Sequence, residues 1–195
     1  MKKDIILAGV GGQGILSIAA IIGTAALDMG LFLKQSEVHG MAQRGGDVSS
    51  NLRIGDHEIA SDLIAKGKAD IVISVEPMEG LRYLPMLCPE GWLITNSTPF
   101  KNISNYPDID GLYSEIEKVH RHVMIDAEKI AKELGTAKAA NVVILGAASD
   151  HLGISYESLE KAIRKIFKRK GESVVELNIN ALKAGRDFAE KNSYL

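Results

Sequence analysis

The sequence predicts an α/β fold with a mostly parallel sheet and a helical C-terminal part. Short apolar runs alternate with helical patterns before residue 138, a glycine-rich turn joins the first predicted strand to an almost wholly apolar helix, and the later pattern is helical. The chain has 195 residues, of which 46% are hydrophobic, so it is long enough to bury one sizeable core. We therefore expect a single domain over residues 1–195.

Runs of apolar and β-branched residues predict the strands. The run at 71–75 is continuous, which is typical of a central strand buried on both faces, whereas residues 47–54 alternate like a half-buried strand. A strand, a helix and a second strand at the N-terminus predict one βαβ unit, which for a parallel pair crosses over in the right-handed sense. The predicted strands are residues 4–8, 31–34, 47–54, 71–75, 92–95 and 122–125.

Capping and stop signals delimit the predicted helices. Asp126 and Ser155 are favourable N-cap residues, and Gly30, Gly135 and Gly153 follow helical patterns as C-terminal stops. The predicted helices are residues 15–29, 77–87 with a stop near Pro89, 127–134, 139–148, a helix from the Ser155 cap to Phe167, and 174–191. The longest irregular connection is predicted at 96–107, where Asn, Ser and Pro are frequent.

The C-terminal helices differ in their patterns. Residues 139–148 are apolar nearly all round, so we expect this helix to be buried on more than one side, with Gly146 allowing close backbone approach. The basic run at 164–170 either interacts with a helix dipole or contacts a partner or an anionic cofactor. A helical apolar stripe precedes and enters that run: Leu159, Ala162, Ile163, Ile166 and Phe167.

Composition excludes several classes of function. A formal net charge of -2 gives no bulk attraction to nucleic acid or to anionic lipid. The one cysteine, Cys88, cannot form an internal disulfide, hold an iron–sulfur cluster or complete a structural zinc site, and a reducing cytoplasm fits this composition. No segment reaches the roughly 18 uninterrupted apolar residues of a membrane span. We expect a cytoplasmic protein with no metal, no nucleic-acid partner and no membrane partner.

The first chemical motif is GVGGQG, in which Gly9, Gly11 and Gly14 match G-x-G-x-x-G. It follows a predicted strand and opens a helix, where backbone N–H groups and the helix dipole favour a phosphate. A dinucleotide site also needs an acidic residue about 20 positions later, and the nearest candidate is Glu37. The alternative is structural, since glycines also permit a tight turn and close packing of the helix on the strand.

The second motif is SEVHGMAQRGG, at residues 36–46. Its Arg44 offers a guanidinium that can grip a carboxylate or a phosphate, and His39 could act as a general base or be a hydrogen-bonded surface group. Gln43 adds hydrogen-bonding capacity without nucleophilic ability. The chain has no G-x-S-x-G elbow, Walker A motif or H-E-x-x-H motif, so it lacks the groups for demanding chemistry on its own.

These two motifs together carry a resemblance to a known family. GVGGQGI followed by EVHGMAQRGGDVSSNLRIG resembles the gamma-type subunit or domain of the 2-oxoacid:ferredoxin oxidoreductases. Further similar segments follow in the same order: Ile59 to Ser61, ADIVISVEP, AANVVILGAA with Asn141, and ELNINALKAG. Related pyruvate and 2-oxoglutarate enzymes typically have Tyr, Pro and Glu before the Arg-Gly-Gly, so the form EVHGMAQ favours the indolepyruvate branch.

The resemblance implies a subunit of a larger enzyme. It implies a Rossmann-like three-layer sandwich, and an activity in which an aryl pyruvate, CoA and oxidised ferredoxin give the acyl-CoA, carbon dioxide and reduced ferredoxin. Thiamine diphosphate, magnesium and iron–sulfur clusters are then expected on a large partner subunit, with ferredoxin reached through the complex and no cofactor bound by this chain alone. The isolated chain would be inactive and could form a homodimer.

The resemblance also implies where the working residues lie. Residues 37–46 would dock and border the active site, with Arg44 and His39 near the partner's cofactor pocket or a CoA phosphate; no residue of this chain is assigned to catalysis beyond these two candidates. The expected cofactor-binding or partner-facing residues are Gly9, Gly11, Gly12, Gln13, Gly14, Glu37, His39, Gly40, Gln43, Arg44, Gly45, Gly46 and Asn141.

Two other functions stay open at this level. A stand-alone NAD(P)-binding oxidoreductase would account for the glycines and would bind nucleotide without a partner. The gamma subunit of a pyruvate or other 2-oxoacid ferredoxin oxidoreductase would keep the complex and change the substrate.

Overall fold

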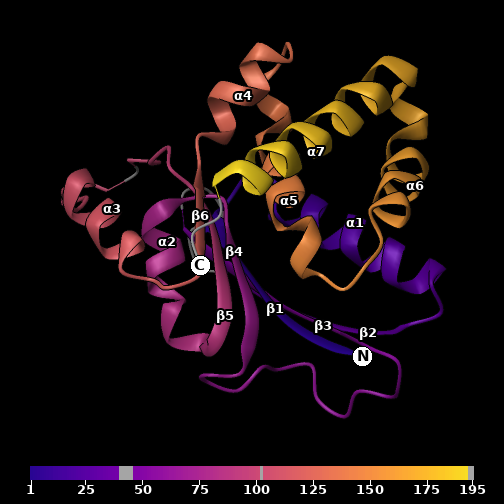
Figure 1. The fold of residues 1–195 in the computed structure, drawn as a ribbon, viewed down its shortest axis with the longest axis horizontal. Coiled ribbons are helices and arrows are strands. Elements are labelled where there is room, and N and C mark those ends of the chain that lie inside the picture. The colour runs from indigo at the N-terminus through magenta and orange to yellow at the C-terminus, as the bar shows by residue number, and fades with distance from the viewer. Residues whose placement is uncertain (40–45, 102, 193–195) are drawn as a thin grey trace.

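The computed structural model describes residues 1–39, 46–101 and 103–192, without the side chain of His39. A six-stranded sheet lies between two layers of helices (Figure 1). Along the chain the strands are β1 (Lys2–Val10), β2 (Phe32–His39), β3 (Asp47–Gly55), β4 (Ala69–Ser74), β5 (Leu87–Asn96) and β6 (His122–Ile125). The helices are α1 (Ile15–Asp28), α2 (Pro77–Arg82), α3 (Ile109–Glu117), α4 (Ala127–Glu133), α5 (Ala140–Ala148), α6 (Tyr156–Phe167) and α7 (Glu172–Asn192). Four 3₁₀ turns, η1 (Leu84–Met86), η2 (Ala137–Ala139), η3 (Ser149–His151) and η4 (Lys168–Lys170), join them.

The sheet is mostly parallel, as predicted. Its strand order is β2-β3-β1-β4-β5-β6, and β1, β4, β5 and β6 form parallel neighbours. The strand β3 is antiparallel to both β1 and β2. The strands β1 and β2 of the first βαβ unit therefore run in the same direction, but they are not neighbours in the sheet. The chain reverses direction after β2, and β3 lies between β2 and β1 and pairs with both.

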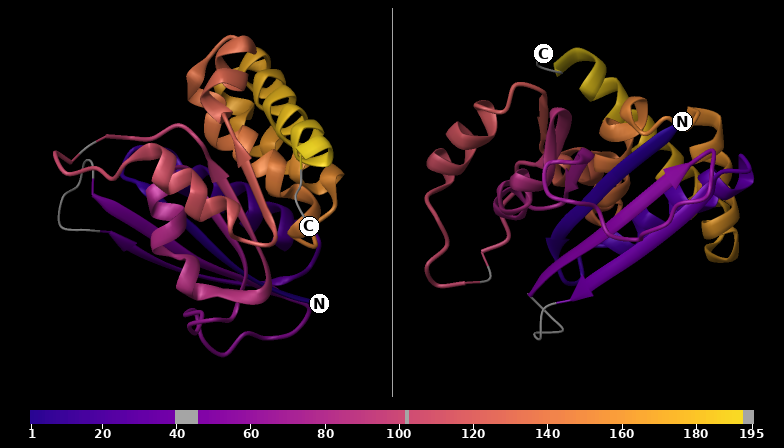
Figure 2. Two further views of the ribbon diagram at one scale, coloured as in Figure 1. Left: turned by 60° about the vertical axis from the view of Figure 1, so that its left-hand side comes forward. Right: turned by 90° about the horizontal axis from the view of Figure 1, so that it is seen from below.

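Helices cover both faces of the sheet (Figure 2). On one face, α1 and α5 pack directly on the strands, and α6 and α7 pack on these two helices. On the other face lie α2 and α3. The larger core fills the α1 and α5 face, and a smaller one on the α2 face contains Ile6, Ile64, Ala69, Val72, Leu93 and Ile116. The fold is the Rossmann-like three-layer sandwich that the sequence resemblance implied.

The predicted capping signals are confirmed. The side chains of Asp126 and Ser155 accept hydrogen bonds from the N–H groups at the third helical positions of α4 and α6. Gly30, Gly135 and Gly153 have φ values of 75°, 110° and 70°, a backbone conformation that favours glycine at a helix end.

Two predictions in the middle of the chain need correction. The helix predicted to run to residue 87 ends at Arg82, and the chain then forms η1 around Pro85, because proline has no N–H group to donate to the carbonyl oxygen four residues earlier and so cannot continue the helix. Pro89 does not stop a helix, since it lies within β5. The helix α3 was not predicted, because among its nine residues only Leu112 and Ile116 are buried.

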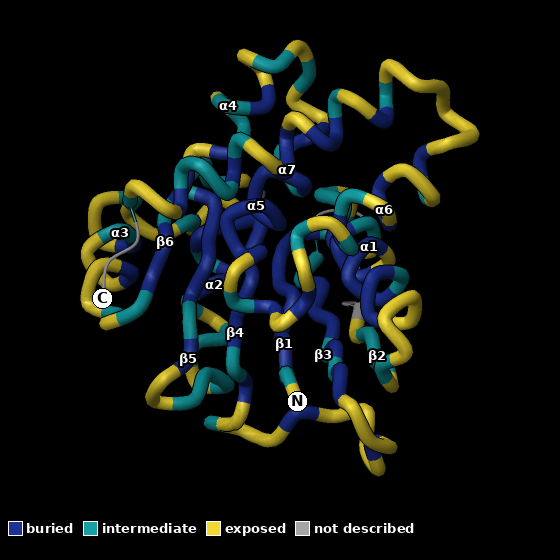
Figure 3. Tube along the Cα trace, turned by 45° about the vertical axis from the view of Figure 1, so that its right-hand side comes forward, coloured by how far each residue is buried: buried dark blue, intermediate teal, exposed yellow. Residues whose placement is uncertain are grey.

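The helix α5 is buried on all sides, as its apolar pattern predicted. Every residue from Val142 to Ala148 is buried, and Figure 3 shows α5 and the central strands as the most continuously buried parts of the trace. It crosses α7 at two glycines. A Cβ atom on Gly146 would lie 2.0 Å from the carbonyl oxygen of Leu182, and one on Gly185 would lie 1.8 Å from that of Val143. The two backbones can approach this closely only because neither residue has a side chain.

We expect Gly146→Ala and Gly185→Ala each to lower the free energy of unfolding by about 1–3 kcal/mol or more, because the added methyl group would meet backbone atoms that cannot move aside. Chemical denaturation followed by circular dichroism measures the effect. Gly111→Ala in α3 is the matched control: its Cβ would have ordinary contacts, the nearest at 3.6 Å, so the better helix propensity of alanine should leave the protein equally or more stable. Equal stability of all three variants would contradict the close crossing.

Candidate functional site

The glycine loop lies at the carboxyl edge of the parallel strands, between the end of β1 and the start of α1. Gln13 closes this loop: its N–H donates to the carbonyl oxygen of Val10 at 3.1 Å, and its side-chain Oε1 accepts from the N–H of Val10 at 2.8 Å. Gly12 and Gly14 have φ values of 100° and 84°, which favour glycine. The predicted turn is thus present, and Gln13 has a clear structural part in it.

Two of the predicted site glycines are also required by packing. A Cβ on Gly9 would lie 2.3 Å from Cγ2 of Val75, and a Cβ on Gly14 would lie 2.5 Å from Nδ2 of Asn141. The Asn141 side chain donates from Nδ2 to the carbonyl oxygen of Gly14 at 3.0 Å, while its Oδ1 accepts from the N–H of Val142 at 3.0 Å. Asn141, at the start of α5, therefore holds the glycine loop in place across a long separation in the sequence.

The end of the second motif joins the first at this edge. The N–H of Gly11 donates to the carbonyl oxygen of Gly46 at 3.0 Å, and the next residue, Asp47, pairs with Val10 in the sheet. The structure thus brings together two motifs that are separated by a helix and a strand. The other predicted residues of this motif, Gly40, Gln43, Arg44 and Gly45, lie outside the described residues, as does the side chain of His39.

Glu37 does not have the position of a ribose-binding acid. It lies within β2, not past the end of the strand, and it pairs with Ser50 of β3. Ser50 in turn pairs with Leu7 of β1, so two strand spacings, about 10 Å, separate Glu37 from β1. The usual dinucleotide fingerprint places the acidic residue on the strand next to β1, and here β3 takes that place.

A group of charged residues that sequence reasoning missed lies on the α2 face of the same edge. Arg82 donates to both carboxylate oxygens of Glu79, at 2.8 and 3.3 Å, and Oη of Tyr83 donates to the Asp47 carboxylate at 3.0 Å. Glu79 is 2% exposed. Burial raises the pKa of the Glu79 carboxyl to about 7, and although Arg82 lowers it, the neighbouring Asp47 carboxylate raises it further.

A second buried carboxylate next to this group has a structural role. Glu76 caps α2 by accepting from the N–H of Glu79 at 2.9 Å, and its other oxygen accepts from the N–H of Phe100 at 3.2 Å and from the hydroxyl of Tyr106. These bonds attach the irregular segment after β5 to the start of α2. Glu76 belongs to the ADIVISVEP segment that resembles the family, but no sequence signal distinguished Glu79 from an ordinary acidic residue at a helix N-terminus.

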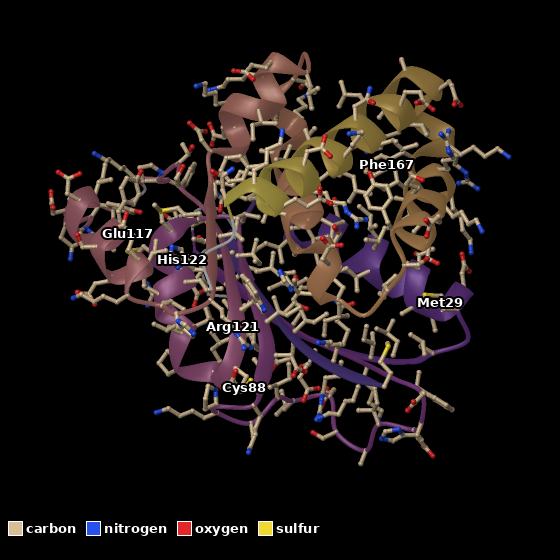
Figure 4. All side chains as sticks on the ribbon, in the orientation of Figure 1. Met29, Cys88, Glu117, Arg121, His122 and Phe167 are labelled. Carbon is tan, nitrogen blue, oxygen red and sulfur yellow. The ribbon has the colours of Figure 1, made fainter. Side chains whose placement is uncertain are left out.

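A cavity of about 900 Å³ opens beside the glycine loop on the α1 face. Its wall includes the loop, the start of α5 and the junction of α6 with α7, where Phe167 lies (Figure 4). Cys88 and Arg121 lie at the opposite, amino edge of the sheet, near the start of β5 and just before β6 (Figure 4). The one thiol of the chain is therefore remote from the candidate site.

Neither a metal-binding cluster nor a membrane-spanning helix occurs among the described residues. Among the described residues, no three His, Cys, Asp or Glu side chains gather in a way that could hold a metal ion. Within the same described part of the chain, no helix is both long enough and apolar enough to cross a membrane.

The sheet order and the glycine loop at its carboxyl edge define the chain as a Rossmann-like α/β protein. The family described as pyruvate ferredoxin/flavodoxin oxidoreductase matches residues 4–188. IorB, a subunit of indolepyruvate oxidoreductase from Archaeoglobus fulgidus, is 38% identical, with 97% of this chain and 96% of that protein covered. IorB from Thermococcus kodakarensis is 35% identical, with 98% of each chain covered. This chain belongs to the pyruvate ferredoxin/flavodoxin oxidoreductase family.

Solved structures agree with this assignment. The gamma subunit of a keto/oxoacid ferredoxin oxidoreductase from Geobacter sulfurreducens has a TM-score of 0.71 at 26% identity, covering 97% of this chain and 99% of that one. The 2-oxoglutarate:ferredoxin oxidoreductase of Magnetococcus marinus, whose structure contains CoA, has a TM-score of 0.78 at 22% identity. It covers 100% of this chain and 32% of that longer chain, and it shows the same fold.

We expect Glu79→Gln to flatten the dependence of stability on pH. Because the pKa of Glu79 is raised from 4.5 to about 7 in the folded state, the folded protein binds more protons than the unfolded one between these values. Wild-type stability should therefore fall as pH rises through that window, by about 3 kcal/mol. Urea unfolding at several pH values measures the slope. Glu133→Gln, at an exposed position, should keep the wild-type slope; a Glu79→Gln variant with that same slope would contradict the raised pKa.

Proposed function

We propose that this chain is the small subunit of an indolepyruvate:ferredoxin oxidoreductase, acting in the cytoplasm as a single domain over residues 1–195. The observation that carries the proposal is the similarity to IorB proteins along nearly the whole chain, at 35–38% identity. The similarity to 2-oxoglutarate synthase subunit KorC of Methanothermobacter thermautotrophicus is lower, at 31% identity. The relatives thus favour an aryl pyruvate over other 2-oxoacids.

The overall reaction requires two kinds of chemistry that this chain's residues do not supply. An aryl pyruvate and CoA are converted to the acyl-CoA and carbon dioxide, and the two electrons released reduce two ferredoxins. When bound, thiamine diphosphate with magnesium supports the decarboxylation and iron–sulfur clusters transfer the electrons one at a time. A cluster usually needs four thiolates and this chain has one cysteine. We infer that a large partner subunit holds these groups and that ferredoxin is reached through it.

The carboxyl edge of the sheet is the part of this chain that we propose to face the partner. Support comes from the bond between Gly11 and Gly46, which fixes the end of the 37–46 segment beside the glycine loop, at the edge where ligands bind in open α/β sheets. In this arrangement His39 and Arg44 belong to the border of the partner's active site, where the guanidinium of Arg44 would bind a carboxylate or a CoA phosphate.

We expect activity only from the pair of subunits. The chain is expressed with and without a large subunit of an indolepyruvate:ferredoxin oxidoreductase under anaerobic conditions, and the reduction of viologen by indolepyruvate and CoA is followed. The lone chain should be inactive because it lacks the redox groups. Failure of the two chains to associate, or oxidation of the substrate by the lone chain with NAD(P), would overturn the proposal.

The contribution of Arg44 is tested in the same assay. Arg44→Ala should leave the complex assembled, lower the rate and raise the concentration of CoA needed for half-maximal activity by roughly tenfold, the loss expected when about 1.4 kcal/mol of a charge-assisted contact is removed. Arg121→Ala is the control, since Arg121 lies at the opposite edge of the sheet, where it pairs with Glu90. An Arg44→Ala complex with an unchanged CoA requirement would remove Arg44 from the proposed site.

A further inference from the structure

One flank of the sheet leaves a long strand edge open. Within the described part of the chain, β2 pairs with β3 alone, so its other edge faces no strand (Figure 1). The strand β2 has eight residues and no proline, whereas β6, at the other end of the sheet, has four residues. A long open edge is a template for pairing with another chain, and a short edge strand is a common protection against such pairing.

Exposed apolar side chains lie along this edge. Phe32 and Val38 are 49% and 55% exposed. Because Leu33 packs against the core on the α1 face, these two residues, at alternate positions, both lie on the α2 face of β2. The lysine between them on that face, Lys34, donates from Nζ to the carbonyl oxygen of Ala60 at 3.2 Å, so its ammonium group is turned toward its own chain.

The apolar flank continues onto α1. Three exposed residues share one face of this helix by their spacing, and the two leucines among them are 52% and 57% exposed: Leu16, Ala20 and Leu27. Gly23, at the border of that face, lies against β2, because a Cβ on it would be 3.1 Å from Cδ2 of Leu33. On another side of the helix, Asp28 pairs with Lys165 of α6. The apolar face of α1 therefore points past β2 rather than toward α6.

The residues of β2 determine how a second copy of the chain fits this edge. Two identical edges pair antiparallel about a two-fold axis perpendicular to the joined sheet, so opposite residues share a face and one residue of β2 lies on the axis. Lys34 or Glu37 on the axis would place like charges opposite each other. Ser36 on the axis would leave Phe32 without an opposite residue in β2, and a residue nearer either end would leave most of the strand unpaired. Gln35 on the axis avoids these faults.

We propose that two copies of the chain associate through β2 and α1, with the two β2 strands antiparallel and Gln35 on the two-fold axis. Phe32 of each copy then lies opposite Val38 of the other, and Lys34 lies opposite Ser36, so no like charges are opposite each other. The apolar faces of the two α1 helices face each other above the joined strands. The carboxyl edges of the two sheets lie at opposite ends of this dimer, where each stays open to a large subunit if the proposed function holds.

Sedimentation velocity of the full chain at roughly 1–100 μM tests the association. We expect a monomer–dimer equilibrium, because one strand pair and two helix faces form an interface at the low end of the usual sizes, roughly 1,200 Å². Phe32→Lys and Val38→Lys should each weaken the dimer at least roughly tenfold, since a charge on an edge strand opposes pairing. Both side chains are exposed, so circular dichroism should show an unchanged fold.

Phe100→Lys is the matched control for these variants. Phe100 is 44% exposed and follows β5, away from the β2 flank, so this variant should dimerise like wild type. A monomer at every concentration, or a dimer that Phe100→Lys weakens and Phe32→Lys does not, would overturn the proposal. A monomer whose complex with the large subunit is lost in Phe32→Lys would also overturn it and would assign the flank to that subunit. The measurement on the chain alone needs neither substrate nor turnover, so it can fail or succeed independently of the proposed function.

Disulfide cross-linking tests the position of the axis. In a Cys88→Ser background, Gln35→Cys would place two thiols opposite each other, with Cα atoms about 4.5–5.5 Å apart, a separation that a disulfide can bridge. Ser36→Cys is the control, because its two copies would lie two residues apart along the paired strands, roughly 8 Å, which is too far. Mild oxidation should therefore give covalent dimers of Gln35→Cys on a non-reducing gel and few of Ser36→Cys. Equal yields, or the reverse order, would overturn the proposed register.

Discussion

The position of α5 is the constraint on which the candidate site depends. This helix is apolar on all sides, so it is held by packing against the sheet and against α7, and its crossing with α7 is set by the two glycines Gly146 and Gly185, whose missing side chains bring the backbones into contact. At its other end, Asn141 donates to the carbonyl oxygen of Gly14 and so fixes the glycine loop. The same helix thus determines both the close crossing with α7 and the geometry of the glycine loop. A substitution that displaces α5 at the crossing should therefore also displace Asn141 and the loop that it holds.

The antiparallel strand β3 explains how the two sequence motifs come to share one edge. If β2 were the direct neighbour of β1, as in a simple βαβ arrangement, the segment after β2 would leave from a position one strand away from the glycine loop. Instead the chain turns back after β2 and enters the sheet beside β1, so Gly46 and Asp47 lie next to Gly11 and Val10. The same insertion moves Glu37 away from the place where a dinucleotide site needs an acid, so the glycine signature occurs here without the acidic residue that usually accompanies it.

The sequence predicted those features that depend on local patterns. The strands, the buried helix α5 and the caps at Asp126 and Ser155 follow from periodicity and backbone chemistry that a few neighbouring residues determine. Features that depend on contacts between residues far apart in the sequence could not be predicted from local patterns. The pairing of Asp47 with Glu79 needs the sheet register and the position of α2 together, and nothing in the local sequence of either residue indicates a raised pKa. The helix α3 was missed because two buried side chains give too weak a pattern.

The two faces of the carboxyl edge have opposite electrostatic character, and the sheet separates them. On the α1 face, the first turns of α1 and α5 contain no acidic residue, and the cavity wall includes Lys138 and Lys170. On the α2 face, Asp47 and Glu79 would place two negative charges beside the end of the 37–46 segment. Because the pKa of Glu79 is raised to about 7, this pair retains a proton for much of the time at neutral pH, and Arg82 compensates the carboxylate when that proton leaves. Asp47 is bonded through the sheet to Val10, which leads directly into the glycine loop. The protonation of Glu79 therefore limits the negative potential next to the end of the segment that contains Arg44.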